Sequence, residues 1–175
     1  MFAPSPPHDP PAPGFHAPNP VRDEWPGLAV VVQSTHLDMF GHANHARYLE
    51  YLEWARMEWA AFHGFPIDES VLKEQVGPAV IRVHIHYRRE CRMGARLRVY
   101  AAAMSARRRI GVIHQEIRDE QTGERVCDAE VTFVMLDLKA RRAVELPPLF
   151  VAAAIRRAAA QAPEPPSDTP EVTSG

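Results

Sequence analysis

Residues 34–56 read STHLDMFGHANHARYLEYLEWAR, and this stretch decides both the fold and the chemistry of the chain. Residues 36–45 alone hold three histidines, one aspartate, one glycine and one asparagine. From Arg47 to His63 the chain then has good helix formers, no proline and no internal glycine, and Gly64 and Pro66 follow. This pattern predicts a helix over 47–63 that stops at the Gly–Pro signal. The loop carries more chemistry than a connection needs, so we expect an active site there.

The predicted helix is apolar around most of its circumference and has only a thin charged stripe. A helix of this kind is normally enclosed by protein, so we expect it to be the central element of the fold. Its apolar residues are Tyr48, Leu49, Tyr51, Leu52, Trp54, Ala55, Met57, Trp59, Ala60 and Phe62.

Strand patterns flank this helix. The run LAVVVQS (28–34) predicts one strand, and the segments 79–90, 95–106, 108–119 and 125–138 predict four more. In AVIRVHIHYRRE (79–90) apolar and polar residues alternate strictly, which predicts one wet face. Short junctions favour antiparallel pairing. We therefore expect an α+β fold, a five-stranded antiparallel sheet wrapped around one long central helix, with a C-terminal helix over 146–160. In the last strand one face should hold Cys127, Ala129, Val131, Phe133 and Met135.

The two ends of the chain are much richer in proline than the part between them. More than half of the 17 prolines fall in residues 1–26, and QAPEPPSDTPEVTSG closes the sequence. Neither end has an apolar period that could offset the entropy of ordering. We expect disordered tails over 1–26 and 161–175, and one folded domain over 27–160.

Charge and cysteine content exclude several classes of partner. A net charge of −2 and a pI near 6.5 give no general electrostatic footprint for nucleic acid or a membrane surface. No apolar run approaches the roughly 20 residues of a membrane span. Cys91 and Cys127 lie in no metal-type spacing, which favours reduced thiols and a cytoplasmic location.

The element order and the loop resemble the hotdog fold and, within it, the 4-hydroxybenzoyl-CoA thioesterase-like family of acyl-CoA thioesterases. The resemblance covers residues 28–138, and its specific part is HLDMFGHANHARYLEYLEWAR. Two positions depart from the family pattern: His36 stands where many members have aspartate, and His45 where many have asparagine. The matching residues are Asp38, Gly41, His42, Asn44, Tyr48, Glu53, Ala55 and Arg56.

Thioester hydrolysis needs a nucleophile or an activated water on one side of the carbonyl group, and hydrogen-bond donors for the developing oxyanion. Free N–H groups at a helix N-terminus are such donors. The resemblance implies that Asp38 is the base or nucleophile and that the His45 backbone amide polarises the carbonyl. No cofactor is expected.

The other loop residues have two possible roles each. Asp38 is equally an Asx-turn former by its residue type. Asn44 is either a helix N-cap or a contact to substrate or water. Gly41 lets the backbone turn beside a ligand. His42 either transfers a proton in catalysis or holds the loop by a hydrogen bond, and the second role is favoured. Tyr48 is a core residue that could also line the substrate site.

Arginines at strand ends are candidates for the phosphates of CoA or of a phosphopantetheine carrier. Each one alone is more simply a solubilising charge beside a turn, but as a group they favour such a substrate. They are Arg88, Arg89, Arg92, Arg107 and Arg108.

A single hotdog subunit leaves an edge strand open, so we expect two copies to pair through strand 79–90. The resemblance extends this homodimer to a homotetramer.

Three alternative functions remain open from the sequence. His36, His42 and His45 could bind a metal ion for a metal-dependent hydrolase, although their spacing fits no compact motif. A hotdog module could also bind an acyl thioester without hydrolysing it. A hydratase of the same fold is a weaker alternative, because its usual catalytic pattern is absent.

Overall fold

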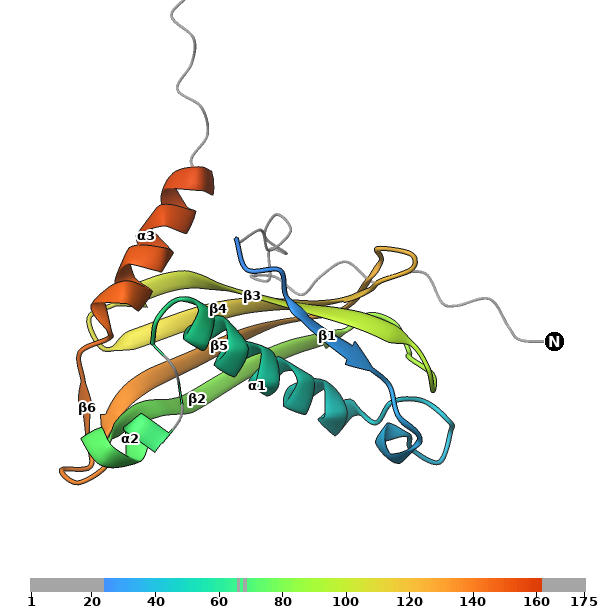
Figure 1. Ribbon diagram of the computed structural model, residues 1–175, viewed down its shortest axis with the longest axis horizontal. Helices are drawn as coiled ribbons and strands as arrows, with labels where there is room; N and C mark the ends of the chain where they lie inside the picture. The colour runs from blue at the N-terminus through green and yellow to red at the C-terminus, as the bar shows by residue number, and fades with distance from the viewer. Residues whose placement is uncertain (1–23, 66, 68, 162–175) are drawn as a thin grey trace, which may run out of the picture.

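The computed structural model describes residues 24–65, 67 and 69–161. Five strands form one antiparallel sheet in the order β1-β3-β4-β5-β2, and a short sixth strand, β6, pairs with the end of β5. Figure 1 shows the sheet curving around α1, with α3 standing at one end. The helices are α1 (His45–Phe62), α2 (Glu69–Glu74) and α3 (Pro148–Gln161), with a 3-10 turn at Ser34–His36. The strands are β1 (Leu28–Val31), β2 (Val76–Tyr87), β3 (Arg96–Arg107), β4 (Ile110–Asp119), β5 (Arg125–Asp137) and β6 (Arg142–Val144).

Helix α1 begins two residues before the predicted start, because Asn44 caps it. The Asn44 Oδ1 atom accepts a hydrogen bond from the Ala46 amide at 2.9 Å. At the other end His63 is the C-cap, and Gly64 takes a φ of 82° that favours glycine. The helix therefore starts where the Asn44 side chain accepts a hydrogen bond from an amide that has no acceptor within the helix, and it ends at the expected glycine.

One face of α1 packs on the sheet, and this face carries the core. Tyr51, Leu52, Ala55 and Trp59 are all completely buried. The expectation that protein encloses the helix on all sides is wrong for the single chain, because Trp54, Met57 and Phe62 are 42%, 42% and 52% exposed. Part of the surface of α1 is therefore apolar and accessible in the single chain.

The inner face of β5 is the one predicted from its alternation. Cys127, Ala129, Val131 and Phe133 are buried, and Met135 packs against the core. β2 departs from its predicted strict alternation because a β-bulge interrupts its register between Val80 and Arg82. Around this bulge both faces of β2 are exposed, so β2 is a true edge strand.

Other features also differ from the sequence-based prediction. The sheet has a sixth strand, β6, where five were expected, and α2 was not predicted. α3 begins at Pro148 rather than at residue 146. The side chain of Trp25 is 6% exposed and packs in the core, although Trp25 lies within the expected tail 1–26. Most of the two predicted tails, residues 1–23 and 162–175, lies outside the described residues.

Candidate functional site

The loop before α1 is closed on itself by backbone hydrogen bonds. Leu37 and Ala43 form an isolated β-bridge, and the Asp38 amide donates to the His42 carbonyl oxygen at 2.8 Å. Gly41 stands at the tip with a φ of 77°, a conformation that favours glycine. The loop therefore holds Asp38 at a fixed place beside the start of α1.

The Asp38 carboxylate is anchored through one of its two oxygens. Asp38 Oδ1 accepts hydrogen bonds from the Phe40 amide at 2.9 Å and from the His42 amide at 3.3 Å. The Asx-turn role is therefore real. Within the described part of the chain, Oδ2 has no hydrogen-bond partner, so the same side chain keeps one oxygen free for chemistry.

The N-terminus of α1 offers free amides next to this carboxylate. The His45 amide donates no hydrogen bond to any described residue, as expected for the first residue of a helix. The carbonyl oxygen of the same residue, His45, accepts a hydrogen bond from the Tyr87 hydroxyl at 3.2 Å. The helix start is thereby fixed against β2 while its amide stays available.

Most of the predicted site residues meet in one surface depression of about 330 Å³, here called the loop site. It combines the loop, the first turn of α1 and the end of β2. Gly41 and Asn44 shape the loop and the helix start without lining this depression. The lining residues are Asp38, His42, Ala43, His45, Tyr48, Tyr87, Arg88, Arg89 and Glu90.

The arginines divide into two groups. Arg88 pairs through Nε with the fully buried Asp128, and this hydrogen bond raises the pKa of the Arg88 guanidinium. Arg89 pairs with Glu124 at the surface. Arg92 does not line the loop site, but its Nη2 atom lies 3.0 Å from Oε1 of Glu90, which does.

Arg107 and Arg108 do not reach the loop site. They end β3, whose first residues lie beside the loop, and a strand of this length spans roughly 36 Å. Their predicted contact with the substrate at this site is therefore not supported by their position.

Histidine contacts in the loop are structural. His42 Nε2 lies 3.2 Å from Glu90 Oε2, in a geometry that is an ion-pair contact rather than a hydrogen bond. The Tyr51 hydroxyl lies 2.7 Å from His36 Nδ1, which also accepts from the Gln33 amide. In the parts of the chain that the structure describes, no three histidine, cysteine or acidic side chains converge as a metal site. His36, His42 and His45 are thus not arranged as the metal alternative requires.

Tyr48 is both a core residue and part of the site wall. It is 3% exposed, and its hydroxyl donates to the Arg89 carbonyl oxygen at 3.4 Å. Burial raises the pKa of this phenol above its ordinary value. Tyr48 is therefore neutral and acts as a hydrogen-bond donor, not as a base.

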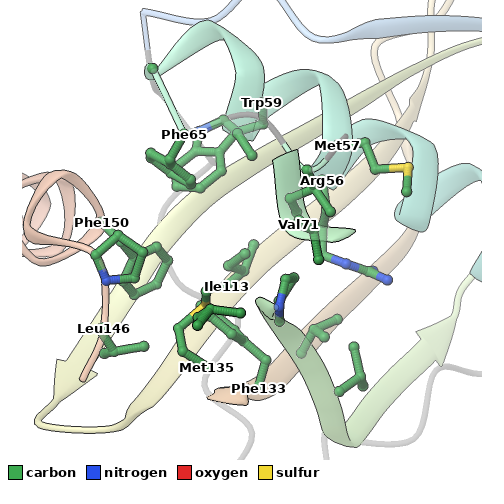
Figure 2. Close-up of a pocket in the computed structure, with 18 of the residues that line it drawn as sticks. Arg56, Met57, Trp59, Phe65, Val71, Ile113, Phe133, Met135, Leu146 and Phe150 are labelled. Carbon is green, nitrogen blue, oxygen red and sulfur yellow. The ribbon is translucent and has the colours of Figure 1, made fainter. Parts of the chain in front are cut away.

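A second, larger cavity of about 770 Å³ lies toward the other end of α1 (Figure 2). We call it the apolar cavity. It lies between the second half of α1, α2, the first half of β2 and the start of α3. Arg56 reaches into it, and burial lowers the pKa of this guanidinium, which donates to Gln115 Oε1 at 2.9 Å. The labelled wall residues are Met57, Trp59, Phe65, Val71, Ile113, Phe133, Met135, Leu146 and Phe150.

The sequence did not identify Tyr87, Glu90 or Asp128 as site residues. Tyr87 and Glu90 flank the Arg88–Arg89 pair, so the arginine cluster was a usable signal for both. Asp128 had no such signal, because it reaches Arg88 only through the pairing of β2 with β5. The apolar cavity also had no local signal, since its walls come from six separate elements.

Comparison with known proteins agrees with this arrangement. Residues 32–154 match the Thioesterase-like superfamily. The long-chain acyl-CoA thioesterase FadM of Escherichia coli (strain K12) is 32% identical over 117 residues, which are 67% of this chain and 87% of FadM.

Solved structures share the fold. YbaW from Escherichia coli superposes with a TM-score of 0.60 at 32% identity, covering 68% of this chain and 88% of YbaW. A 1,4-dihydroxy-2-naphthoyl-CoA thioesterase from Synechocystis gives a TM-score of 0.67 at 16% identity, covering 73% and 93% of the two chains. The sequence match and the shared fold together confirm the predicted hotdog thioesterase, and the chain belongs to the Thioesterase-like superfamily.

Proposed function

We propose that this protein hydrolyses an acyl-CoA thioester at the loop site, with Asp38 as the base or nucleophile. One observation carries the proposal: Asp38, which has one oxygen without a hydrogen-bond partner among the described residues, and His45, whose amide is free, line the same depression. The relationship to FadM, a long-chain acyl-CoA thioesterase, supports the choice of substrate.

The chemistry follows from these two groups. The thioester carbonyl oxygen accepts a hydrogen bond from the His45 amide, whose helix dipole stabilises the oxyanion that develops. Asp38 Oδ2 either removes a proton from an attacking water or attacks the carbonyl carbon itself. The C–S bond then breaks and CoA leaves as the thiol, taking the proton that Asp38 removed from the attacking water or, on the nucleophile route, a proton from solvent. On the nucleophile route a water then hydrolyses the Asp38–acyl anhydride, which releases the free acid and restores the carboxylate. Tyr48 and Tyr87 hold the helix start in place while this happens.

The CoA moiety, or a phosphopantetheine carrier, is placed over the end of β2. Arg88 and Arg89 line the loop site there, and guanidinium groups suit phosphate oxygens. Both arginines follow Tyr87 directly, so the strand end carries the phosphate-binding part of the site.

The binding place of the acyl group depends on how the subunits assemble, so we propose the two together. β2 is an edge strand, and Val80, Ile81 and Val83 on it are 49%, 58% and 40% exposed. Exposed apolar edges favour pairing with a second copy. Antiparallel pairing of two β2 edges brings the end of β2 that carries Arg88 toward the beginning of the partner's β2, and in each subunit that beginning lines the apolar cavity. The acyl group then enters this cavity from the neighbouring loop site, in a homodimer that assembles further to a homotetramer.

Two further points belong to the proposal. A cytoplasmic location agrees with Cys91 and Cys127, which are both free thiols and buried. Among the described helices, none is long and apolar enough to cross a membrane.

A panel of acyl-CoA esters with detection of released thiol tests the function. The panel should include short, long and aromatic acyl groups, each measured for hydrolysis and for binding. Hydrolysis of at least one ester with a kcat above the spontaneous rate is expected. Binding of several esters without release of thiol would instead support a non-catalytic acyl-thioester module.

A further inference from the structure

Asp128 is a fully buried carboxylate that the proposed reaction does not use. It lies on β5 in register with His86 of β2, two residues before Arg88. Its Oδ1 atom pairs with Arg88 Nε, and its Oδ2 atom has no hydrogen-bond partner among the described residues. Arg88 is therefore the direct hydrogen-bonding partner of this buried charge.

The pairing with Asp128 determines which nitrogens of the Arg88 guanidinium remain available to bind a ligand. Nε is occupied by Asp128, while the two terminal nitrogens have no ion-pair or hydrogen-bond partner in the described part of the chain. The side chain is 32% exposed and lines the loop site. Two adjacent donors on a fixed plane suit the oxygens of a phosphate group. The Arg88 amide also donates to the Val126 carbonyl oxygen at 2.9 Å, which fixes the backbone of this residue.

We propose that Asp128 is a positioning residue for the substrate: it holds Arg88 so that the terminal guanidinium nitrogens bind a phosphate of the CoA moiety. This inference rests on the proposed function. Asp128 does not touch the reacting atoms, and its effect reaches the substrate only through Arg88.

A neighbouring carboxylate provides a matched control. Glu116 is also completely buried and is paired with arginines, lying 2.9 Å from Arg118 and 2.8 Å from Arg125. It faces Asp128 in the register of β4 with β5, and Arg125 also lies 3.9 Å from Asp128 Oδ1. Glu116 acts on Arg88 through its charge alone and, among the described residues, makes no hydrogen bond or ion pair with it. A purely structural role for these buried pairs would give Asp128→Asn and Glu116→Gln the same consequences, whereas positioning of Arg88 would separate them.

The test measures CoA binding by calorimetry, and KM and kcat for an acyl-CoA beside the N-acetylcysteamine thioester of the same acid. The second substrate has the thioester but no phosphate. Asp128→Asn keeps an oxygen that can accept from Arg88 Nε but removes the negative charge that strengthens this bond. It should therefore weaken CoA binding and raise KM for acyl-CoA by up to about tenfold, with kcat nearly unchanged. KM for the phosphate-free thioester should not change, Glu116→Gln should behave like the wild type, and Asp128→Glu should restore part of the loss.

Equal KM changes for both substrates, or wild-type CoA binding by a folded Asp128→Asn variant, would overturn the inference. If Asp128→Asn does not fold, Arg88→Lys takes its place, because the three N–H groups of an ammonium diverge from one nitrogen and cannot reproduce the planar guanidinium, which bonds Asp128 through Nε and presents two other nitrogens to a phosphate. Unchanged CoA binding by Arg88→Lys would then refute the positioning role. Absence of hydrolysis by the wild type, with CoA binding still weakened by Asp128→Asn, would refute the proposed function and leave the inference standing.

Discussion

Comparing Asn44→Ala with Asn44→Ser separates the role of Asn44 in helix capping from a role in catalysis, and the alanine variant gives the cost of losing the cap. The change removes one hydrogen bond, from the Ala46 amide to Asn44 Oδ1 at 2.9 Å. Two backbone bonds of Asn44 survive, its amide to the His36 oxygen and the Arg47 amide to its own oxygen, both 2.9 Å. Ala46 is exposed, so water replaces the lost acceptor, and the cost should be about 1 kcal/mol. For a chain of this size that is about 3 °C in Tm.

Urea unfolding of Asn44→Ala should show a lower midpoint at an unchanged m value. Asn44→Ser keeps a capping oxygen, so it should recover most of the stability. If Asn44 is only a cap, the serine variant should also recover kcat/KM. A serine variant that is as stable as the wild type, yet hydrolyses the ester as slowly as Asn44→Ala or more slowly, would refute a role limited to capping. It would show that the side-chain amide of Asn44 contacts substrate or water.

Three further substitutions test the core, the sheet and the assembly. Phe150→Ala should cost about 3 kcal/mol or more in urea unfolding, because this 1% exposed ring contacts three other aromatic rings. Burial, aided by the positive charge of Arg157, lowers the pKa of His114 from 6.5 to about 4. The folded state therefore binds fewer protons, and stability should fall as pH drops from about 6.5 toward 4, a slope that His114→Gln should remove. Ile81→Lys on the β2 edge should give monomers by light scattering, whereas Ile155→Lys, equally exposed on α3, should not.

The fold was predictable because its strongest patterns are local. The predicted helix 47–63 missed only the first two residues of α1, whose start is determined by the Asn44 cap, and extended one residue too far at its end. The alternation in β5 identified its buried face correctly, since a period of two needs no knowledge of neighbouring strands. β2 departed from its alternation because a bulge and an open edge are properties of the whole sheet. The short elements α2 and β6 are held by tertiary contacts and carry no strong local pattern.

Only part of the candidate site could be predicted from the sequence. The loop, the helix start and the Arg88–Arg89 pair come from two short segments, and the structure brings them together. Arg107 and Arg108 looked similar in sequence, but strand length carries them to the other end of the sheet. Asp128 and the apolar cavity depend on strand register and on packing between distant elements, which a single sequence does not reveal.

The central claim is that the free oxygen of Asp38 performs the chemistry, and Asp38→Asn tests it most directly. The asparagine carbonyl oxygen can still accept from the Phe40 and His42 amides, so the loop should keep its shape. The measurement is single-turnover hydrolysis of the best acyl-CoA ester, with binding of the same ester measured in parallel. The account predicts a fall in rate of about 100-fold or more with binding nearly unchanged. A variant that binds and hydrolyses the ester at the wild-type rate would contradict it.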